Sequence, residues 1–202
     1  VDALIRENAP NVPIPNWKKL NIDGLKYNNF KHRKMALIRF DLISALPPGA
    51  VVTSAKLQLY RINGTNITTP RKIGVYKINT DVDIDIATWS SFKKSMYNST
   101  PLDVKQVKYT AAKKPYQWDV TLNVKAILSG ASNNYGWLIK DTKKTGQWGY
   151  NHVFASANHP KSDYNPVLII KYTLPAELGI TSSSNEICTG ETSKLTASGG
   201  SN

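Results

Sequence analysis

Cysteine is nearly absent from this sequence, and so are the patterns that mark many enzymes and membrane proteins. The single thiol, Cys188, provides neither a disulfide framework nor a zinc site. No apolar run approaches the roughly 20 residues that a membrane helix needs, so we expect no membrane insertion. The motifs GxSxG, HExxH and CxxC and a phosphate-binding glycine loop are missing. These absences argue against the common catalytic classes, and we expect a protein that is not an enzyme.

Acidic residues are scarce relative to basic ones. The 202 residues include 26 lysines and arginines but only 14 aspartates and glutamates, which gives a net charge of +12. From Glu177 to the end there are three glutamates and one lysine, so a charge of +14 belongs to the residues before Glu177. Such an excess favours an anionic partner, namely an acidic polysaccharide, a nucleic acid or an anionic surface. A basic surface that is simply solvated is the alternative.

Most of the chain consists of short apolar segments between turn signals such as "LPPG" and "SGASNN", a pattern typical of an antiparallel all-β sandwich or barrel. We expect strands at Ala3–Glu7, Lys19–Asp23, Met35–Leu42, Ala55–Ile62, Lys72–Ile78, Gln117–Leu122, Tyr135–Lys140, His152–Ser156 and Val167–Tyr172. In residues 121–130, Val124, Ile127 and Leu128 follow helical spacing and Gly130 suits a C-terminal stop. The sequence therefore predicts an all-β fold with at most one short helix.

Two charged residues interrupt the apolar strand Met35–Leu42. Alternation places Ile38, Phe40 and Leu42 on one face and Leu37, Arg39 and Asp41 on the other. The first face is the predicted core. The second face predicts an ionic network with the similarly alternating segment "DALIRE", or a surface that meets a ligand.

Five stretches occur in the order "DALIRE", "ALIRFDLISALPPGAVVTSAKLQLY", "ATW", "WDVTLNVKAILSGASNNYGWLIKD" and "VFASANHPKSDYNPVLIIKY". Together they resemble the disaggregatase-related (DNRLRE) domain family of secreted bacterial and archaeal proteins, over nearly all of residues 1–174. The resemblance implies a jelly-roll-type β-sandwich, usually attached to other domains of a larger secreted or cell-surface protein. For some members it implies a carbohydrate-binding module for acidic polysaccharides such as alginate. The lysine-rich stretch "FKKSMYNSTPLDVKQVKYTAAKKPY" departs from the family pattern.

The composition changes near Pro175, where a Ser/Thr/Gly-rich stretch begins. The segments "GITSS" and "TSKLTASG" are strand-like, but residues 176–202 are too few to bury a core of their own. The stretch resembles the opening of an immunoglobulin-like repeat. We therefore expect one domain at residues 1–175, followed by a linker and the truncated start of a second domain at 176–202.

Aromatic residues lie beside cations in two predicted loop regions. Sugar rings stack on Trp and Tyr, while Lys and Arg pair with carboxylates or sulfates, so such mixtures predict a carbohydrate site. Trp89, Trp118 and Trp137 are instead expected in the core. The predicted ligand-binding residues are Trp17, Lys18, Lys19, Tyr27, His32 and Arg33 in the first region, and Lys140, Trp148, Tyr150 and His152 in the second.

Other readings of these residues remain open. The aromatic and basic mixture also suits single-stranded nucleic acid, but no nucleic-acid motif is present and we expect no specific nucleic-acid partner. Tyr150 and His152 lie two residues apart and would suit a polysaccharide lyase or hydrolase. The alternating Asp81, Asp83 and Asp85 resemble a calcium loop that lacks its glycine, or a solvated strand with Val82, Ile84 and Ile86 turned inward.

We therefore expect a non-catalytic, extracellular binding module for an acidic, alginate-like polysaccharide. The alternative is a structural or adhesive stalk domain without a ligand of its own. No cofactor is expected, and a structural calcium ion stays open.

Overall fold

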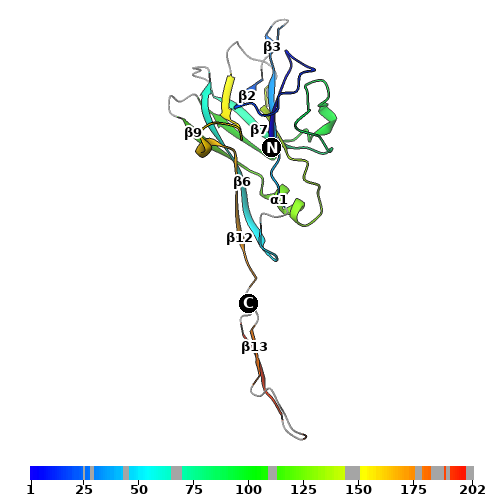
Figure 1. Ribbon diagram of the computed structural model, residues 1–202, viewed down its shortest axis with the longest axis vertical. Coiled ribbons are helices and arrows are strands. Elements are labelled where there is room, and N and C mark those ends of the chain that lie inside the picture. Colours follow the sequence, from blue (N-terminus) through cyan, green and yellow to red (C-terminus); the bar gives the residue numbers. More distant parts are fainter. Residues whose placement is uncertain are drawn as a thin grey trace.

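A computed structural model describes residues 1–24, 26–27, 30–42, 46–64, 70–108, 113–143, 151–175, 179–182, 189 and 192–198. Within these residues, antiparallel pairing joins ten strands into one large curled sheet (Figure 1). The strands are β1 (Asp2–Arg6), β2 (Lys19–Asp23), β5 (Lys34–Ile38), β6 (Val51–Gly64), β7 (Arg71–Lys77), β8 (Asp103–Val107), β9 (Lys114–Asp119), β10 (Trp137–Asp141), β11 (Asn151–Ala155) and β12 (Val167–Thr173).

The curled sheet forms the two layers of a β-sandwich. The strands follow the order β12-β6-β11-β2-β5-β10-β7-β8, with β1 added beside β5 and β9 beside β6. Inward side chains of β5, β7 and β10 pack in one buried cluster with those of β6, β9 and β11. The predicted all-β, jelly-roll-type sandwich is confirmed.

The two buried tryptophans join the layers by hydrogen bonds as well as by packing. The indole N–H of Trp118 in β9 donates to the carbonyl of Ile73 in β7 at 2.8 Å. The indole N–H of Trp137 donates at 2.8 Å to the side chain of Asn123, in the helix α1 (Thr121–Leu128). The predicted core positions of Trp118 and Trp137 and the predicted short helix are therefore confirmed.

The outer face of the β1–β5–β10–β7 layer carries a second apolar cluster. Ile5, Leu37, Tyr76 and Leu138 face outward there and are covered by the connection between β7 and β8. This connection includes the short helix η1 (Lys94–Met96). Because the connection covers the ends of several strands, its residues also lie beside the ends of β2, β5 and β10.

Shorter elements complete the described fold. A second 3-10 helix, η2 (Ser162–Tyr164), precedes β12. Two small two-stranded sheets pair β3 (Lys26–Tyr27) with β4 (Phe30–Lys31), and β13 (Gly179–Ser182) with β14 (Leu195–Ser198). In Figure 1 the β13–β14 hairpin lies apart from the sandwich. None of the helices in the described segments is long and apolar enough to cross a membrane.

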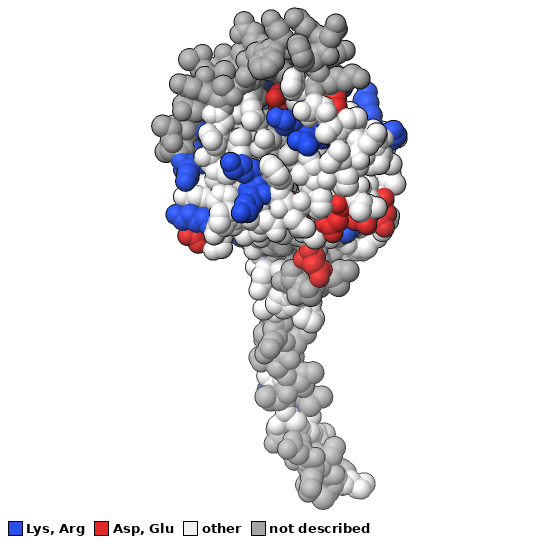
Figure 2. All heavy atoms as spheres, turned by 45° about the horizontal axis from the view of Figure 1, so that its top comes forward, with Lys and Arg blue, Asp and Glu red and all other residues white. Residues whose placement is uncertain are grey.

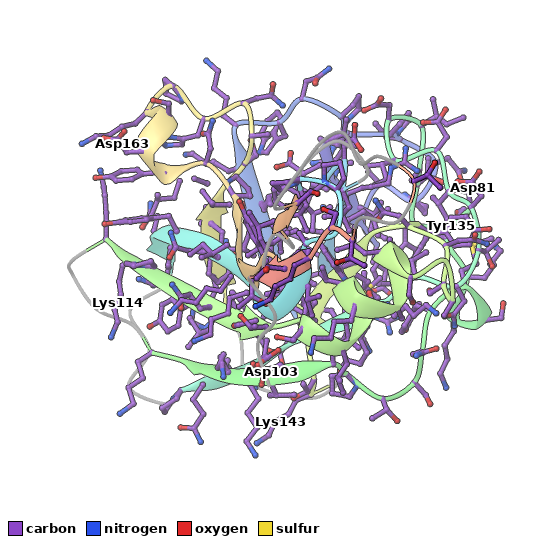
Figure 3. The ribbon with its side chains drawn as sticks, turned by 90° about the horizontal axis from the view of Figure 1, so that it is seen from below. Asp81, Asp103, Lys114, Tyr135, Lys143 and Asp163 are labelled. Carbon is purple, nitrogen blue, oxygen red and sulfur yellow. The ribbon has the colours of Figure 1, made fainter. Side chains whose placement is uncertain are left out.

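The strand predicted at Met35–Leu42, which contains the charged residues Arg39 and Asp41, is shorter than predicted. β5 ends at Ile38, and Arg39 lies 3.7 Å from Asp81 in an exposed ion pair. The Asp81 side chain is 77% exposed, and Figure 3 places it at an edge of the molecule. Arg39 therefore belongs to a surface pair, of the kind that contributes about 0–1 kcal/mol.

The segment with alternating aspartates forms a turn and not the strand we considered. Asp83 accepts the backbone N–H of Asp85 at 3.1 Å, as in an Asx turn. Ile84 is buried while Ile86 is 66% exposed, so the expected inward alternation fails there. Within the described ranges, no group of three or more His, Cys, Asp or Glu side chains is placed to hold a metal ion.

Candidate functional site

An open pocket of about 430 Å³ lies where the connection after β7 meets the ends of β2, β5 and β10. This volume falls within the range of roughly 300–1,000 Å³ that is usual for ligand sites. Its walls come from four parts of the chain that are remote in sequence. The lining residues are Asp23, Gly24, Arg33, Met35, Trp89, Ser90, Phe92, Lys93, Lys94, Tyr97, Lys140, Asp141 and Lys143.

Arg33 is the most firmly held cation of this pocket. Its Nε and Nη2 donate to the two carboxylate oxygens of Glu7 at 2.9 and 2.5 Å. Two further hydrogen bonds join these residues, since Glu7 N–H donates to the Arg33 carbonyl and Arg33 backbone N–H donates to the Glu7 carboxylate. The hydrogen bond to Glu7 is the main cause that raises the pKa of Arg33.

Trp89 supports the same guanidinium from one side. The guanidinium carbon lies 4.9 Å from the centre of the Trp89 ring, within the distance of a cation–π contact. The loop that carries Trp89 is fixed in turn, because Ser90 N–H donates to the carbonyl of Pro10 at 2.8 Å. Arg33 is thus oriented by an acid and a ring.

Lys140 is held by aromatic rings from two elements. Its Nζ lies 4.5 Å from the ring centre of Tyr76 in β7 and 5.2 Å from that of Tyr97. Gly74, which pairs with Lys140, makes this arrangement possible, because a Cβ there would lie 2.8 Å from the Tyr76 ring. Burial raises the pKa of both tyrosines, so both phenols are protonated at neutral pH.

Asp141 shapes the floor of the pocket and adds little net charge to it. Its side chain is 1% exposed and accepts from Arg71 Nε at 2.6 Å. The other carboxylate oxygen accepts the backbone N–H of Lys143 at 2.8 Å, which fixes the turn after β10. Gly24 lets this turn approach β2, because a Cβ there would lie 2.6 Å from the Lys143 carbonyl oxygen.

The charge of the pocket is strongly positive. Five basic side chains line it against two acidic ones; Asp141 is paired with Arg71 and Arg33 with Glu7, which leaves four lysines against Asp23. Figure 2 shows that charge is also unevenly spread on the surface in view, with a group of acidic side chains at lower right and basic ones at the left and above. The pocket can therefore attract and hold an anionic ligand.

The pocket brings together cations from the two regions predicted from sequence. Arg33 comes from the first region and Lys140 from the second. His32 is half-buried and does not line the pocket. Trp17, 51% exposed, and the exposed Lys18 and Lys19 lie at the other end of β2 from Asp23 and outside the pocket.

Three of the predicted aromatic side chains fall outside the part of the chain that the structure describes. The side chain of Tyr27, and Trp148 and Tyr150 as a whole, lie outside the described residues. His152 is described and is 0% exposed. Because its ring is enclosed by the sandwich, a ligand at the surface does not reach it.

The aromatic residues of the pocket were missed by the sequence reasoning. Trp89 packs against the outer apolar cluster, in part as predicted, but it is only half-buried and its ring also contacts Arg33. Phe92, Lys93, Lys94 and Tyr97 fell in the stretch treated as a departure from the family pattern. The signal was present in "WSSFKKSMY", which contains aromatic and basic residues close together, as the two selected regions do.

A β-sandwich with an open, ligand-sized pocket near its surface is the form of a binding module. The model of carbohydrate-binding module family 96 matches residues 2–172, and the chain belongs to this family. The match runs from the start of β1 to one residue before the end of β12 and thus covers nearly all of the sandwich. No curated protein matches the chain significantly.

Proposed function

We propose that this module binds an acidic polysaccharide of the uronate type, similar to alginate, in the pocket between Arg33, Trp89 and Lys140. The observation that carries the proposal is the ring of five cations around an open pocket in a carbohydrate-binding module. A polyuronate carries a carboxylate on each sugar, and each carboxylate is a suitable partner for Arg and Lys. The net charge of +12 would speed the approach of such a chain.

The aromatic rings that line the pocket, and Tyr76 beside it, support an anionic ligand over a neutral one. Trp89 faces Arg33, and Tyr76 and Tyr97 face Lys140, so these rings already contact cations of the protein. Neutral glycans depend on free aromatic faces for much of their affinity. Charge pairing therefore has the larger share of the binding here.

Binding is favoured over the lyase or hydrolase alternative. A lyase that used Tyr97 as its base would need a phenol of lowered pKa, whereas burial raises the pKa of Tyr97. No histidine is among the described residues that line the pocket. A stalk domain without a ligand would have no use for a cationic pocket of this kind.

The proposal extends to the setting of the module. We infer that it belongs to a secreted or cell-surface protein, in which residues 1–175 form the binding domain and the β13–β14 hairpin belongs to the following one. In this setting the module would hold a larger protein close to its polysaccharide.

Affinity gel electrophoresis against alginate, polygalacturonate and neutral dextran tests the proposal. We expect the two polyuronates to retard the protein at moderate salt and dextran to leave its mobility unchanged. Lys140→Met should weaken polyuronate binding roughly tenfold, because a hydrogen bond to a charged group is worth about 1.5–3 kcal/mol.

Lys125→Met is the matched control. Lys125 is exposed on α1, outside the pocket, and its replacement removes the same charge. Equal losses in Lys140→Met and Lys125→Met would mean that only the overall charge of the protein matters. No retardation of the unaltered protein by either polyuronate would reject the proposal and favour the stalk domain.

A further inference from the structure

Glu7 is an acid placed beside a site that we propose for a polyanion, which is unfavourable unless the acid has another role. Its carboxylate is 6% exposed and stands behind Arg33, on the side away from solvent. It uses both oxygens on the guanidinium, and its backbone N–H donates to the Arg33 carbonyl. Each of these contacts restricts the position of Arg33.

The hydrogen bonds to Glu7 leave a defined part of the guanidinium for a ligand. Glu7 takes Nε and Nη2, which form the side edge of the planar group. Within the described residues, Nη1 makes no hydrogen bond, so the end edge formed by Nη1 and Nη2 keeps parallel N–H donors. The Arg33 side chain is 35% exposed and lines the pocket, and the end edge is the part turned from the buried acid.

Trp89 completes the restraint. The ring lies against the guanidinium at 4.9 Å and limits its rotation about the side-chain bonds. A guanidinium that is held by an acid at one edge and by a ring at one face presents its end edge in a fixed plane. The cost of ordering this long side chain is then met before the ligand binds.

A fixed fork distinguishes between kinds of anion. A carboxylate is planar, and its two oxygens match two parallel N–H donors. A sulfate ester spreads its charge over three oxygens in a tetrahedral group and is held as well by lysine ammonium groups, which act as point charges. Lys94 and Lys143 at the pocket offer such point charges, and Lys93 offers a third from an ammonium group that donates to the Ser90 carbonyl.

We propose that Glu7 is a positioning residue that makes this site selective for carboxylate-bearing over sulfated polysaccharide, by fixing the Arg33 fork with the help of Trp89. The inference rests on the proposed function of the same pocket. It makes an unusual prediction about charge: removal of a negative charge next to the site should weaken the binding of a uronate polymer.

The test compares Glu7→Gln with the unaltered protein on polygalacturonate and on dextran sulfate, by affinity electrophoresis at low and moderate salt. The amide keeps the size of Glu7 but has one acceptor oxygen, and its NH₂ group opposes the guanidinium. We expect at least a fivefold loss of affinity for polygalacturonate at moderate salt. Affinity for dextran sulfate should stay unchanged or rise, because the net charge increases by one.

Arg33→Lys is the second variant, because it keeps both the charge of the site and the buried Glu7. Its affinity for polygalacturonate should fall as that of Glu7→Gln does, and its affinity for dextran sulfate should stay unchanged. This second variant keeps the inference testable if Glu7→Gln does not fold, which circular dichroism and a melting curve would reveal. A purely structural role of Glu7 would not change the ratio of the two affinities.

The outcomes separate the two proposals. If Glu7→Gln binds both polymers as tightly as the unaltered protein or more tightly, Glu7 acts only through its charge and the inference is wrong. If the unaltered protein binds both polymers equally at moderate salt, acidic polysaccharide binding stands and carboxylate selectivity is wrong. If it binds neither polymer, both the proposed function and the inference about Glu7 are wrong.

Discussion

His152 and Arg61 form a polar pair inside the sandwich. Arg61 Nε donates to His152 Nδ1 at 3.3 Å, and the two residues are 2% and 0% exposed. Burial, followed by the positive charges of Arg61 and Arg71, lowers the pKa of His152 from 6.5 to about 4. The imidazole is therefore neutral in the folded protein at neutral pH.

This shift predicts how stability depends on pH. Between pH 6.5 and 4 the unfolded chain takes up a proton at His152 that the folded protein does not. The contribution of His152 to the free energy of unfolding should thus be fully present above pH 6.5. It should fall by about 3 kcal/mol as the pH drops toward 4. Chemical denaturation at several pH values would measure it.

The variant His152→Gln separates this contribution from that of the carboxylates. It keeps an acceptor for Arg61 and has no group that titrates. Its free energy of unfolding should vary less between pH 6.5 and 4 than that of the unaltered protein. The same pH dependence in both proteins would show that His152 is not responsible.

At the scale of elements, the pocket depends on how closely the strand ends approach one another. β2 ends at Asp23, β5 begins at Lys34 and β10 ends at Asp141, and these ends lie together because Asp23 pairs with Lys34 and Ile139 with Ala36. The turn after β10 can reach β2 only because residue 24 has no side chain. Small changes in this contact should therefore alter the pocket.

We predict that Gly24→Ala lowers both stability and affinity. The added methyl group would lie 2.6 Å from the Lys143 carbonyl oxygen and 2.7 Å from Asp141 Cβ, so the turn must move. Such overpacking costs about 1–3 kcal/mol. Melting temperature and retardation by polygalacturonate should both decrease.

Gly130→Ala is the matched control for this prediction. Gly130 has φ +76° at the end of α1, and nothing lies within 4 Å of an added Cβ. Its replacement should cost roughly 1–2 kcal/mol through backbone strain and leave affinity unchanged. If Gly24→Ala retains full affinity, the approach of the turn after β10 does not control the site.

At the scale of the whole molecule, the sandwich and the hairpin are distinct units of pairing. In the part of the chain that the structure describes, β13 pairs only with β14, and β12 pairs with β6 inside the sandwich. Among the residues whose burial is described, the last one packed in the buried clusters is Ile170 of β12. The sandwich should therefore not need the hairpin for its stability.

Removal of residues 176–202 tests this expectation. The shortened chain should melt within about 2 °C of the full chain, the shift that corresponds to less than 1 kcal/mol for a domain of this size. It should also bind polygalacturonate with the same affinity, because the pocket lies in the sandwich. A large drop in melting temperature would mean that the last residues belong to the same cooperative unit.

Local periodicity let the sequence by itself predict most strands of the sandwich, the faces of the core and the helix α1, although β8 was not predicted. Ile38, Leu42, Trp118 and Trp137 are buried as their patterns predict, because burial of apolar faces is a local consequence of strand period. The same reasoning selected Arg33 and Lys140, because aromatic and basic residues are neighbours in sequence there. It predicted the apolar packing of Trp89 but not its contact with Arg33, which comes from a distant segment.

Only the tertiary structure decided which cations share a pocket. Arg33, Trp89 and Lys140 are far apart in sequence and meet because β5 pairs with β10 and the connection after β7 folds over their ends. The partner of Arg33 is Glu7 and that of Arg39 is Asp81, neither of which follows from strand alternation. Pairing between remote segments depends on sheet register and loop path, which a local pattern does not contain.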